Sequence, residues 1–305
     1  MQEYKIVRFS EEQIDAFLWL YSCSFNSDPN KELFVKKFNT TYSGKSYIAF
    51  MAYDLEGCPA AFYGVFPCIY QNGSEKLLGA QSGDTMTHPN HRKKGLFYKL
   101  AKATYNLAYN EGIKYIYGIP NGNSYHGFQK MGWKTPYTIM EYEKGVSPKL
   151  FTKVLRRISR NAYKKHINNL IQKHKIQEAL KCNRNGSFSL YRDEKYLKYK
   201  KYNQNVVLSF KSGKAWVSYK VFDLVIGDLE PIADKNKLDL INELIDFASK
   251  VGCSKVVAYD YSFDQNGMDH LKGFVKVEDR HIIILDQGLS LETPIAISAT
   301  DFDTF

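Results

Sequence analysis

The sequence predicts a mixed α/β protein with two domains, and three observations support that class. The chain has 305 residues, about twice the length of an ordinary domain. Hydrophobic residues make up 44% of it and charged residues 24%, which is the composition of a packed globular protein. Stretches with strand periodicity alternate with stretches of helical periodicity. A mixed sheet covered by helices accommodates this alternation.

The first half begins with helices and continues with strands. Tight turns at Glu56-Gly57 and Asn72-Gly73 join three strands, which is the pattern of an antiparallel meander. The predicted elements are, in order, helices over Glu11–Phe25 and Lys31–Phe38, strands over Tyr47–Tyr53, Ala60–Tyr70 and Leu77–Thr87, a helix over Phe97–Glu111, and strands over Tyr115–Ile119 and Tyr137–Tyr142.

The second half repeats this order. Gly112 and Gly252 each precede a predicted strand, and Gly132 and Gly273 follow them at separations of 20 and 21 residues. This correspondence indicates a duplicated fold. Its predicted elements are strands over Asn205–Phe210, Ala215–Tyr219 and Leu224–Leu229, a helix over Lys235–Lys250 and a strand over Lys255–Asp260.

The net charge of +10 comes from one segment. Phe151–Lys201 contains 15 Lys and Arg residues against three Asp and Glu, and the rest of the chain is slightly acidic. Apolar residues at near-helical spacing predict one or two amphipathic helices at its start. The segment is interpreted either as a solvated helical face or as a positive wall for a polyanion. That polyanion is a nucleotide diphosphate, a cofactor phosphate, an acyl carrier protein or a nucleic acid.

The sequence gives no sign of a metal site, a disulfide framework or a membrane span. Its five cysteines are widely spaced and form no C-x-x-C pair, so we expect them to be reduced packing residues. No apolar run approaches the roughly 20 residues of a membrane span, and the first residues lack the apolar core of a signal peptide. We therefore expect a cytoplasmic protein without a metal.

A candidate phosphate-binding loop lies between the third strand of the meander and the following helix. Arg92, Lys93 and Lys94 supply positive charge, and Gly95 allows the backbone to turn and to approach a ligand closely. The N–H groups of the first helical turn then point outward without partners in the helix. The Gly-x-Gly-x-x-Gly and Walker patterns are absent, which argues against a dinucleotide fold or an NTPase.

This loop, with the segment Asn123–Trp133 (NSYHGFQKMGW), resembles the GNAT acyltransferase family over about the first 145 residues. The family motif is a strand, Val-x-Pro, and then Gln/Arg-x-x-Gly-x-Gly/Ala opening a helix; Phe97 departs from its last position. The resemblance implies that acyl-coenzyme A binds here as co-substrate. The residues to which it assigns binding are Met86, Thr87, Arg92, Lys93, Lys94, Gly95, Leu96, Phe97, Asn123 and Phe128.

The second half corresponds to a degenerate copy of the same fold. Val225–Asp234 (VIGDLEPIAD) stands where the basic glycine loop should be, and its acidic residues would repel a pyrophosphate. We therefore expect a tandem GNAT-like protein. Its parts are an acyl-CoA-binding domain over 1–148, a basic helical connector over 149–188, and a degenerate domain over 189–305 that contributes to the acceptor site.

The resemblance implies direct attack of an amine on the acyl-CoA thioester, without a covalent enzyme intermediate. Backbone N–H groups then polarise the carbonyl, and a base takes the ammonium proton. Asp84 is the first candidate for the base; otherwise it anchors an acceptor hydroxyl or caps the corner. His88 is a second candidate. The family's general-acid Tyr falls on Phe128, with Tyr125 one helical turn earlier as a substitute.

The chain looks similar to tandem GNAT proteins of surface-polysaccharide loci, such as those of lipopolysaccharide O-antigen biosynthesis. The acceptor implied is a nucleotide-linked amino sugar of the dTDP-amino-deoxyhexose type, with Arg156 and Arg160 of the connector holding its diphosphate. Two alternatives stay open: a tRNA-dependent aminoacyl ligase of peptidoglycan assembly, and an idle GNAT scaffold that binds a partner. If the acceptor is a nucleotide-linked amino sugar, we expect no nucleic-acid partner.

Overall fold

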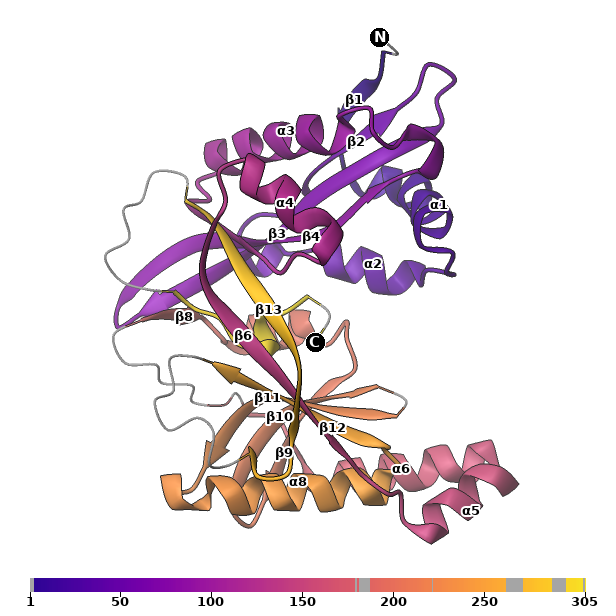
Figure 1. Ribbon diagram of the computed structural model, residues 1–305, viewed down its shortest axis with the longest axis vertical. Helices are drawn as coiled ribbons and strands as arrows, with labels where there is room; N and C mark the ends of the chain where they lie inside the picture. The colour runs from indigo at the N-terminus through magenta and orange to yellow at the C-terminus, as the bar shows by residue number, and fades with distance from the viewer. Residues whose placement is uncertain are drawn as a thin grey trace. The chain divides into compact units, whose positions relative to one another are not determined.

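The computed structural model describes residues 3–178, 180, 187–220, 222–261, 271–286, 295–303 and 305. The chain forms two compact units (Figure 1). Unit 1 comprises Met1–Pro136, Asn185–Tyr202 and Ile282–Ala296, and unit 2 comprises Tyr137–Arg184, Asn203–His281 and Ile297–Phe305. No helix within the described residues is long and apolar enough to cross a membrane.

Unit 1 contains a twisted mixed sheet. Its strands lie in the order β1-β2-β3-β4-β5-β13, and all neighbouring pairs are antiparallel except β4 and β5, which are parallel. A short strand β8 pairs with β3 and with β14. The strands are β1 (Lys5–Arg8), β2 (Ile48–Tyr53), β3 (Pro59–Asn72), β4 (Glu75–Thr87), β5 (Tyr115–Gly118), β8 (Phe188–Leu190), β13 (Val275–Asp286) and β14 (Ile295–Ala296).

Helices cover both faces of this sheet, because successive strand residues point to opposite sides. Phe62 packs with α1 and α2, whereas its neighbour Tyr63 packs with α3 and α4. The helical elements of unit 1 are η1 (Glu11–Gln13), α1 (Ile14–Phe25), α2 (Lys31–Phe38), η2 (Thr41–Ser43), η3 (Pro89–His91), α3 (Leu96–Asn110), α4 (Gly122–Lys130) and α7 (Glu194–Lys200).

In unit 2 the strands lie in the order β13-β6-β12-β11-β10-β9-β7, with β11 and β12 parallel. One hydrophobic core joins its strands to α6 and α8. Its elements are β6 (Lys134–Gly145), α5 (Leu150–Ile158), α6 (Arg160–His174), β7 (Lys175–Ile176), β9 (Asn205–Phe210), β10 (Gly213–Lys220), β11 (Asp223–Pro231), η4 (Asp234–Asn236), α8 (Lys237–Val251), β12 (Lys255–Tyr261) and η6 (Ala299–Asp301).

The same succession of strand, strand, helix and strand occurs in both units. β4 pairs with β5 over three positions starting at Gly79 opposite Tyr115, and β11 pairs with β12 over three positions starting at Asp223 opposite Lys255. The helices between them, α3 and α8, have 15 residues each. This mixed α/β fold agrees with the fold class and the internal repeat that the sequence predicts.

The compact units divide the chain elsewhere than after residues 148 and 188. β6 begins in unit 1 and ends in unit 2, and β13 returns in the opposite sense so that its last residues pair with β5. The basic segment Phe151–Lys201 divides in the same way: α5 and α6 belong to unit 2, whereas α7 belongs to unit 1. Pairing between strands far apart in sequence sets these boundaries.

Candidate functional site

β4 and β5 pair and then part, which exposes one edge of β4. Their pairing runs from Gly79 opposite Tyr115 to Gln81 opposite Tyr117. β5 ends soon after, whereas β4 continues to Thr87. Main-chain groups of the second half of β4 therefore have no partner in β5 and are available to a bound molecule.

A β-bulge lies in this unpaired half of β4. Phe62 of β3 is opposite Met86, but Gly64 is opposite Gly83, so β4 carries an extra residue between these two pairs. Asp84 adopts the left-handed conformation within the bulge, with φ of 53°. Because a bulge interrupts the regular ladder and turns a side chain away from its usual direction, it aims Asp84 differently from its neighbours.

Asp84 forms a nearly buried ion pair with Lys37 of α2. The Lys37 Nζ lies 2.7 Å from Asp84 Oδ2, and the two side chains are 6% and 12% exposed. The same ammonium lies 4.7 Å from the centre of the Phe66 ring. A proton on Asp84 would leave the Lys37 charge buried beside apolar rings, which is costly. The pair therefore favours the carboxylate form of Asp84.

The predicted phosphate loop connects β4 to α3. Lys93 has φ of 61° and Gly95 has φ of 75°, so the backbone reverses sharply before the helix. No described side chain caps α3 at Gly95, and a Cβ at Gly95 would meet no described atom within 4 Å. Arg92, Lys93 and Lys94 are exposed around this open helix end. Backbone donors and positive charge together fit a pyrophosphate.

Two of the predicted coenzyme A residues have buried side chains and contribute only main-chain atoms to this surface. Met86 and Leu96 are buried with 4% and 2% exposure, and they pack into opposite cores of unit 1. Thr87 pairs with Ala61, and its carbonyl oxygen accepts a hydrogen bond from Arg92 Nε at 3.4 Å. The side chain of Asn123 lies outside the described residues.

Phe97 fits into the first turn of α3 because glycine stands opposite it. A Cβ at Gly127 of α4 would lie 2.8 Å from Phe97 Cε1. The Phe97 ring meets the buried Phe128 ring edge to face at 5.2 Å, so Phe128 is a packing residue without a hydroxyl. The Tyr125 hydroxyl lies 3.0 Å from Thr135 Oγ1. A proton-donating role for Tyr125 stays a prediction.

A buried hydroxyl network lies where β4 leaves β5, and sequence reasoning missed it. The Tyr63 hydroxyl lies 2.8 Å from Ser82 Oγ and 3.0 Å from the Tyr105 hydroxyl, which accepts a hydrogen bond from Trp133 Nε1. Burial raises the pKa of Tyr63 well above its ordinary value and that of Tyr105 to about 12. Both hydroxyls therefore stay protonated at neutral pH, and the network holds Ser82 in place at the start of the unpaired edge.

His88 belongs to a second group of side chains, around the loop and the β2–β3 turn. Its ring stacks on Trp19 of α1 at 5.5 Å, and its Nδ1 accepts a hydrogen bond from the backbone N–H of Asn90. His91 lies between the Tyr4 hydroxyl, 3.0 Å away, and Asp54 Oδ2, 3.6 Å away. These contacts hold both histidines in fixed positions.

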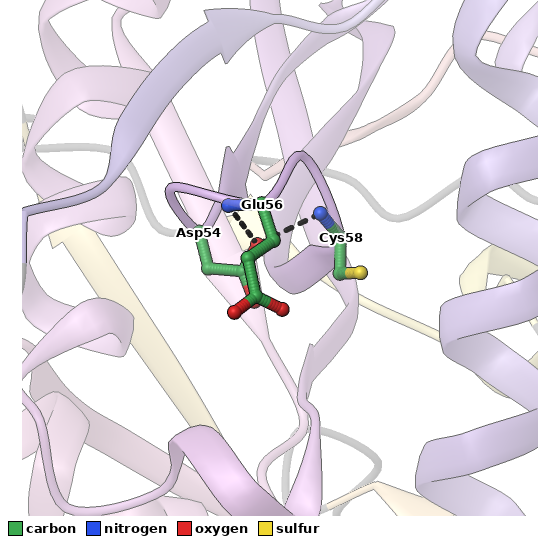
Figure 2. Close-up of side chains that lie close together, drawn as sticks. All are labelled: Asp54, Glu56 and Cys58. Atoms are coloured by element: carbon green, nitrogen blue, oxygen red, sulfur yellow. Dashed lines mark hydrogen bonds between the residues drawn. The ribbon is translucent and has the colours of Figure 1, made fainter.

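Figure 2 shows Asp54 with Glu56 and Cys58, whose potential ligand atoms lie within 4.8 Å of one another. Asp54 Oδ1 accepts hydrogen bonds from the backbone N–H groups of Glu56 and Cys58 at 3.1 and 2.8 Å. This is the usual way in which an aspartate closes a turn. The grouping is explained by the hairpin itself, and we assign no metal to it.

Arg156 and Arg160, predicted to hold the acceptor diphosphate, lie on α5 and at the start of α6 in unit 2. Both are exposed, and the Arg156 guanidinium lies 5.2 Å from the centre of the Phe222 ring. Their role stays a prediction.

Comparison with known proteins identifies the class of unit 1. Residues 5–135 match the family model described as an acetyltransferase (GNAT) domain. The match covers less than half of the chain, so it identifies this part of unit 1 as similar to that family. This similarity supports the activity that the sequence predicts, an acyl-CoA-dependent N-acyltransferase. A comparison with curated protein sequences finds no significant match.

Solved structures of acyltransferases share the fold across nearly the whole chain. A GCN5-related N-acetyltransferase from Kribbella flavida has a TM-score of 0.60 at 13% identity, covering 93% of this chain and 72% of its own. A GCN5-related N-acetyltransferase from Anabaena variabilis has a TM-score of 0.60 at 13% identity, with 92% and 72% covered. Saccharomyces cerevisiae N-myristoyltransferase with bound myristoyl-CoA has a TM-score of 0.59 at 9% identity, with 97% and 83% covered.

Proposed function

We propose that the protein transfers an acyl group from acyl-CoA to the amino group of a nucleotide-linked amino sugar. The observation that carries the acyl-CoA part is the unpaired edge of β4, with its bulge at Asp84 and the open basic end of α3 at Gly95. The acceptor part is supported by the resemblance to tandem GNAT proteins of surface-polysaccharide loci and by the return of basic α7 to unit 1.

In the proposed reaction the amine nitrogen attacks the thioester carbonyl and forms the C–N bond of an amide. The nitrogen attacks as a neutral amine, becomes positively charged when the C–N bond forms, and then loses a proton. The C–S bond breaks, and coenzyme A leaves as a thiolate that takes up a proton. Backbone N–H groups along the free edge of β4 stabilise the developing oxyanion. The loop from Arg92 to Gly95 holds the pyrophosphate, which places the thioester beside β4.

Asp84 is the proposed contact for the acceptor. Because Lys37 favours its ionised form, Asp84 is better suited to attract an ammonium group or to accept a hydrogen bond from a sugar hydroxyl than to store a proton. Among the roles expected from the sequence, the ion pair therefore supports the anchor more than the base.

The proposal is tested by incubating the full chain with acetyl-CoA and longer acyl-CoAs against a panel of nucleotide amino sugars, with release of free thiol as the measurement. The same amino sugars without the nucleotide form the matched acceptor control. We expect thiol release with a nucleotide-linked acceptor and little with the free sugar. Acylation of free sugars alone, or thiol release with none of the panel, would refute the acceptor assignment.

A further inference from the structure

A depression of about 630 Å³ lies on unit 1, lined by side chains from α2, η2 and α7. It lies outside the acyl-CoA loop, and part of its wall comes from α7, which the GNAT family match over residues 5–135 does not include. Its volume falls within the range of pockets that hold small molecules of nucleotide size.

Three tyrosines form an ordered aromatic wall in the depression. Tyr42 and Tyr199 have ring centres 4.6 Å apart, and Tyr199 and Tyr202 have ring centres 5.1 Å apart. The Tyr42 hydroxyl donates to the carbonyl oxygen of Pro67, which limits motion of that ring. Burial raises the pKa of Tyr42 well above its ordinary value, so the wall is neutral there. Flat, fixed rings of this kind suit stacking of a nucleobase.

Four lysines add positive charge around the aromatic wall. Lys36 is paired with Glu32, with Nζ 2.5 Å from Oε1. Lys195, Lys198 and Lys201 are exposed, and none of them forms an ion pair with another residue in the described part of the chain. Lysine ammonium groups in this arrangement attract phosphate oxygens. No carboxylate among the described residues neutralises Lys195, Lys198 or Lys201.

We propose that this depression binds the nucleoside diphosphate part of the acceptor, with the phosphates at Lys198 and Lys201 and the base against the tyrosines. This inference rests on the proposed function, because it assigns a place to the nucleotide of the proposed substrate. A single bounded depression matches one nucleotide better than a polynucleotide, which needs an extended basic groove.

The depression is connected to the reaction site through Lys37. The Tyr199 hydroxyl donates a hydrogen bond of 2.9 Å to the carbonyl oxygen of Lys37, whose ammonium holds Asp84. Both features belong to unit 1. A nucleotide stacked on Tyr199 would therefore contact a side chain that is hydrogen-bonded to Lys37. Lys37 in turn orients Asp84, the proposed acceptor contact. Part of the basic segment predicted from the sequence supplies this site through α7.

The test measures binding of thymidine diphosphate to the full chain by calorimetry, without acyl-CoA. We expect Lys198→Glu/Lys201→Glu to weaken that binding by about tenfold or more, because each reversal replaces a charge-assisted contact by repulsion. Lys5→Glu, an exposed lysine of β1 outside the depression, is the matched control and should leave the affinity unchanged. Inorganic pyrophosphate should bind more weakly than thymidine diphosphate, because it lacks the base.

Three results would overturn the proposal. One is unchanged thymidine diphosphate affinity in Lys198→Glu/Lys201→Glu. Another is loss of affinity only in Arg156→Glu/Arg160→Glu, which would place the diphosphate in unit 2. The third is preferential binding of an RNA oligonucleotide over thymidine diphosphate. None of these measurements uses acyl transfer. A failed acylation assay would therefore count against the proposed function, whereas the binding measurements would still decide whether the depression holds a nucleotide.

Discussion

Unit 1 and unit 2 each contain a Gly-Asp pair at a bulge in corresponding strands, Gly83-Asp84 in β4 and Gly227-Asp228 in β11. In both strands the pair comes just after the three positions that pair with the next parallel strand. The surroundings differ. Asp84 faces the ammonium of Lys37, whereas Asp228 Oδ2 accepts hydrogen bonds of 2.5 Å from Thr300 Oγ1 and 3.4 Å from Ser298 Oγ.

Residues from Ser298 to Asp303, together with Phe305, close the space beside β11 in unit 2. A Cβ at Gly227 would collide with Thr300 and Phe305. The Phe302 ring packs against Tyr259 of β12 at 5.7 Å. β4 separates from β5 in unit 1, and β11 separates from β12 in unit 2. In unit 2, however, Thr300 and Phe305 occupy the place beside the bulge.

This difference predicts that only one of the two related folds has a ligand site beside its bulge. Unit 1 keeps an open helix end with Arg92, Lys93 and Lys94 beside it. In unit 2 most of the VIGDLEPIAD stretch, which the sequence predicts in place of that loop, lies within β11, and the short connection from Ile232 to α8 has no basic glycine run. Hydroxyl groups and an aromatic ring of the same chain lie beside Gly227 and Asp228. We therefore expect unit 1 alone to bind coenzyme A.

The largest expected effect comes from Gly95→Asp. The change forces a Cβ into a left-handed backbone and places a carboxylate where a pyrophosphate binds, so coenzyme A affinity should fall by about a hundredfold or more, as measured by calorimetry. Gly73→Asp is a matched control, because Gly73 also has positive φ and open space. Unchanged affinity in folded Gly95→Asp would show that the loop does not hold the cofactor.

Asp84→Asn should raise the KM for the acceptor by about tenfold or more and leave acyl-CoA affinity unchanged, because an uncharged amide attracts an ammonium group poorly. Steady-state kinetics at several pH values measure both. Lys37→Met/Asp84→Asn separates lost stability from lost binding, since it removes both buried charges. A fall in kcat by roughly 10²–10⁴ with KM preserved would instead make Asp84 the general base.

The comparison also predicts stoichiometry. A calorimetric titration of the full chain should give one coenzyme A per chain, because unit 2 lacks the basic glycine loop and its bulge is already covered. Two coenzyme A molecules per chain would mean that the segment Ser298–Phe305 moves aside and that the acidic stretch tolerates a pyrophosphate.

Thr300→Val should lower the free energy of unfolding by about 1–3 kcal/mol, because it leaves the buried Asp228 carboxylate short of a donor. Chemical denaturation measures the loss, and coenzyme A affinity should not change. A double-mutant cycle with Asp228→Asn should show coupling between the two residues. If the two losses of unfolding free energy are additive, the hydroxyl contacts with Asp228 do not hold Ser298 and Thr300 beside β11.

The smallest effect concerns pH and should be confined to unit 1. Burial, followed by the charge of Lys94, lowers the pKa of His91 below its ordinary value. The unfolded chain then binds this proton more readily, so the contribution of His91 to stability is present above about pH 6.5 and lost as pH falls below it. His91→Gln should make unfolding less pH-dependent between pH 7 and 5. An unchanged slope would contradict this.

The sequence by itself determined most elements and the location of the phosphate loop. The helix over Lys31–Phe38 is confirmed at both ends, and the strands of the meander agree within a few residues. These features depend on local periodicity and on turn residues such as Gly57 and Gly73, which act over a few neighbouring positions. The run from Arg92 to Gly95 is similarly local, because one short peptide supplies its charge and its turn.

Only the tertiary structure decided which side chains meet. Two strands, β2 and β3, separate Lys37 of α2 from Asp84 of β4 along the chain. Tyr63 reaches Ser82 and Tyr105 from a neighbouring strand. β13 pairs with β5 across more than half of the chain, and α7 returns to unit 1 after two helices of unit 2. Such contacts follow from strand register and burial of apolar faces, which depend on the whole fold and leave no short pattern in the sequence.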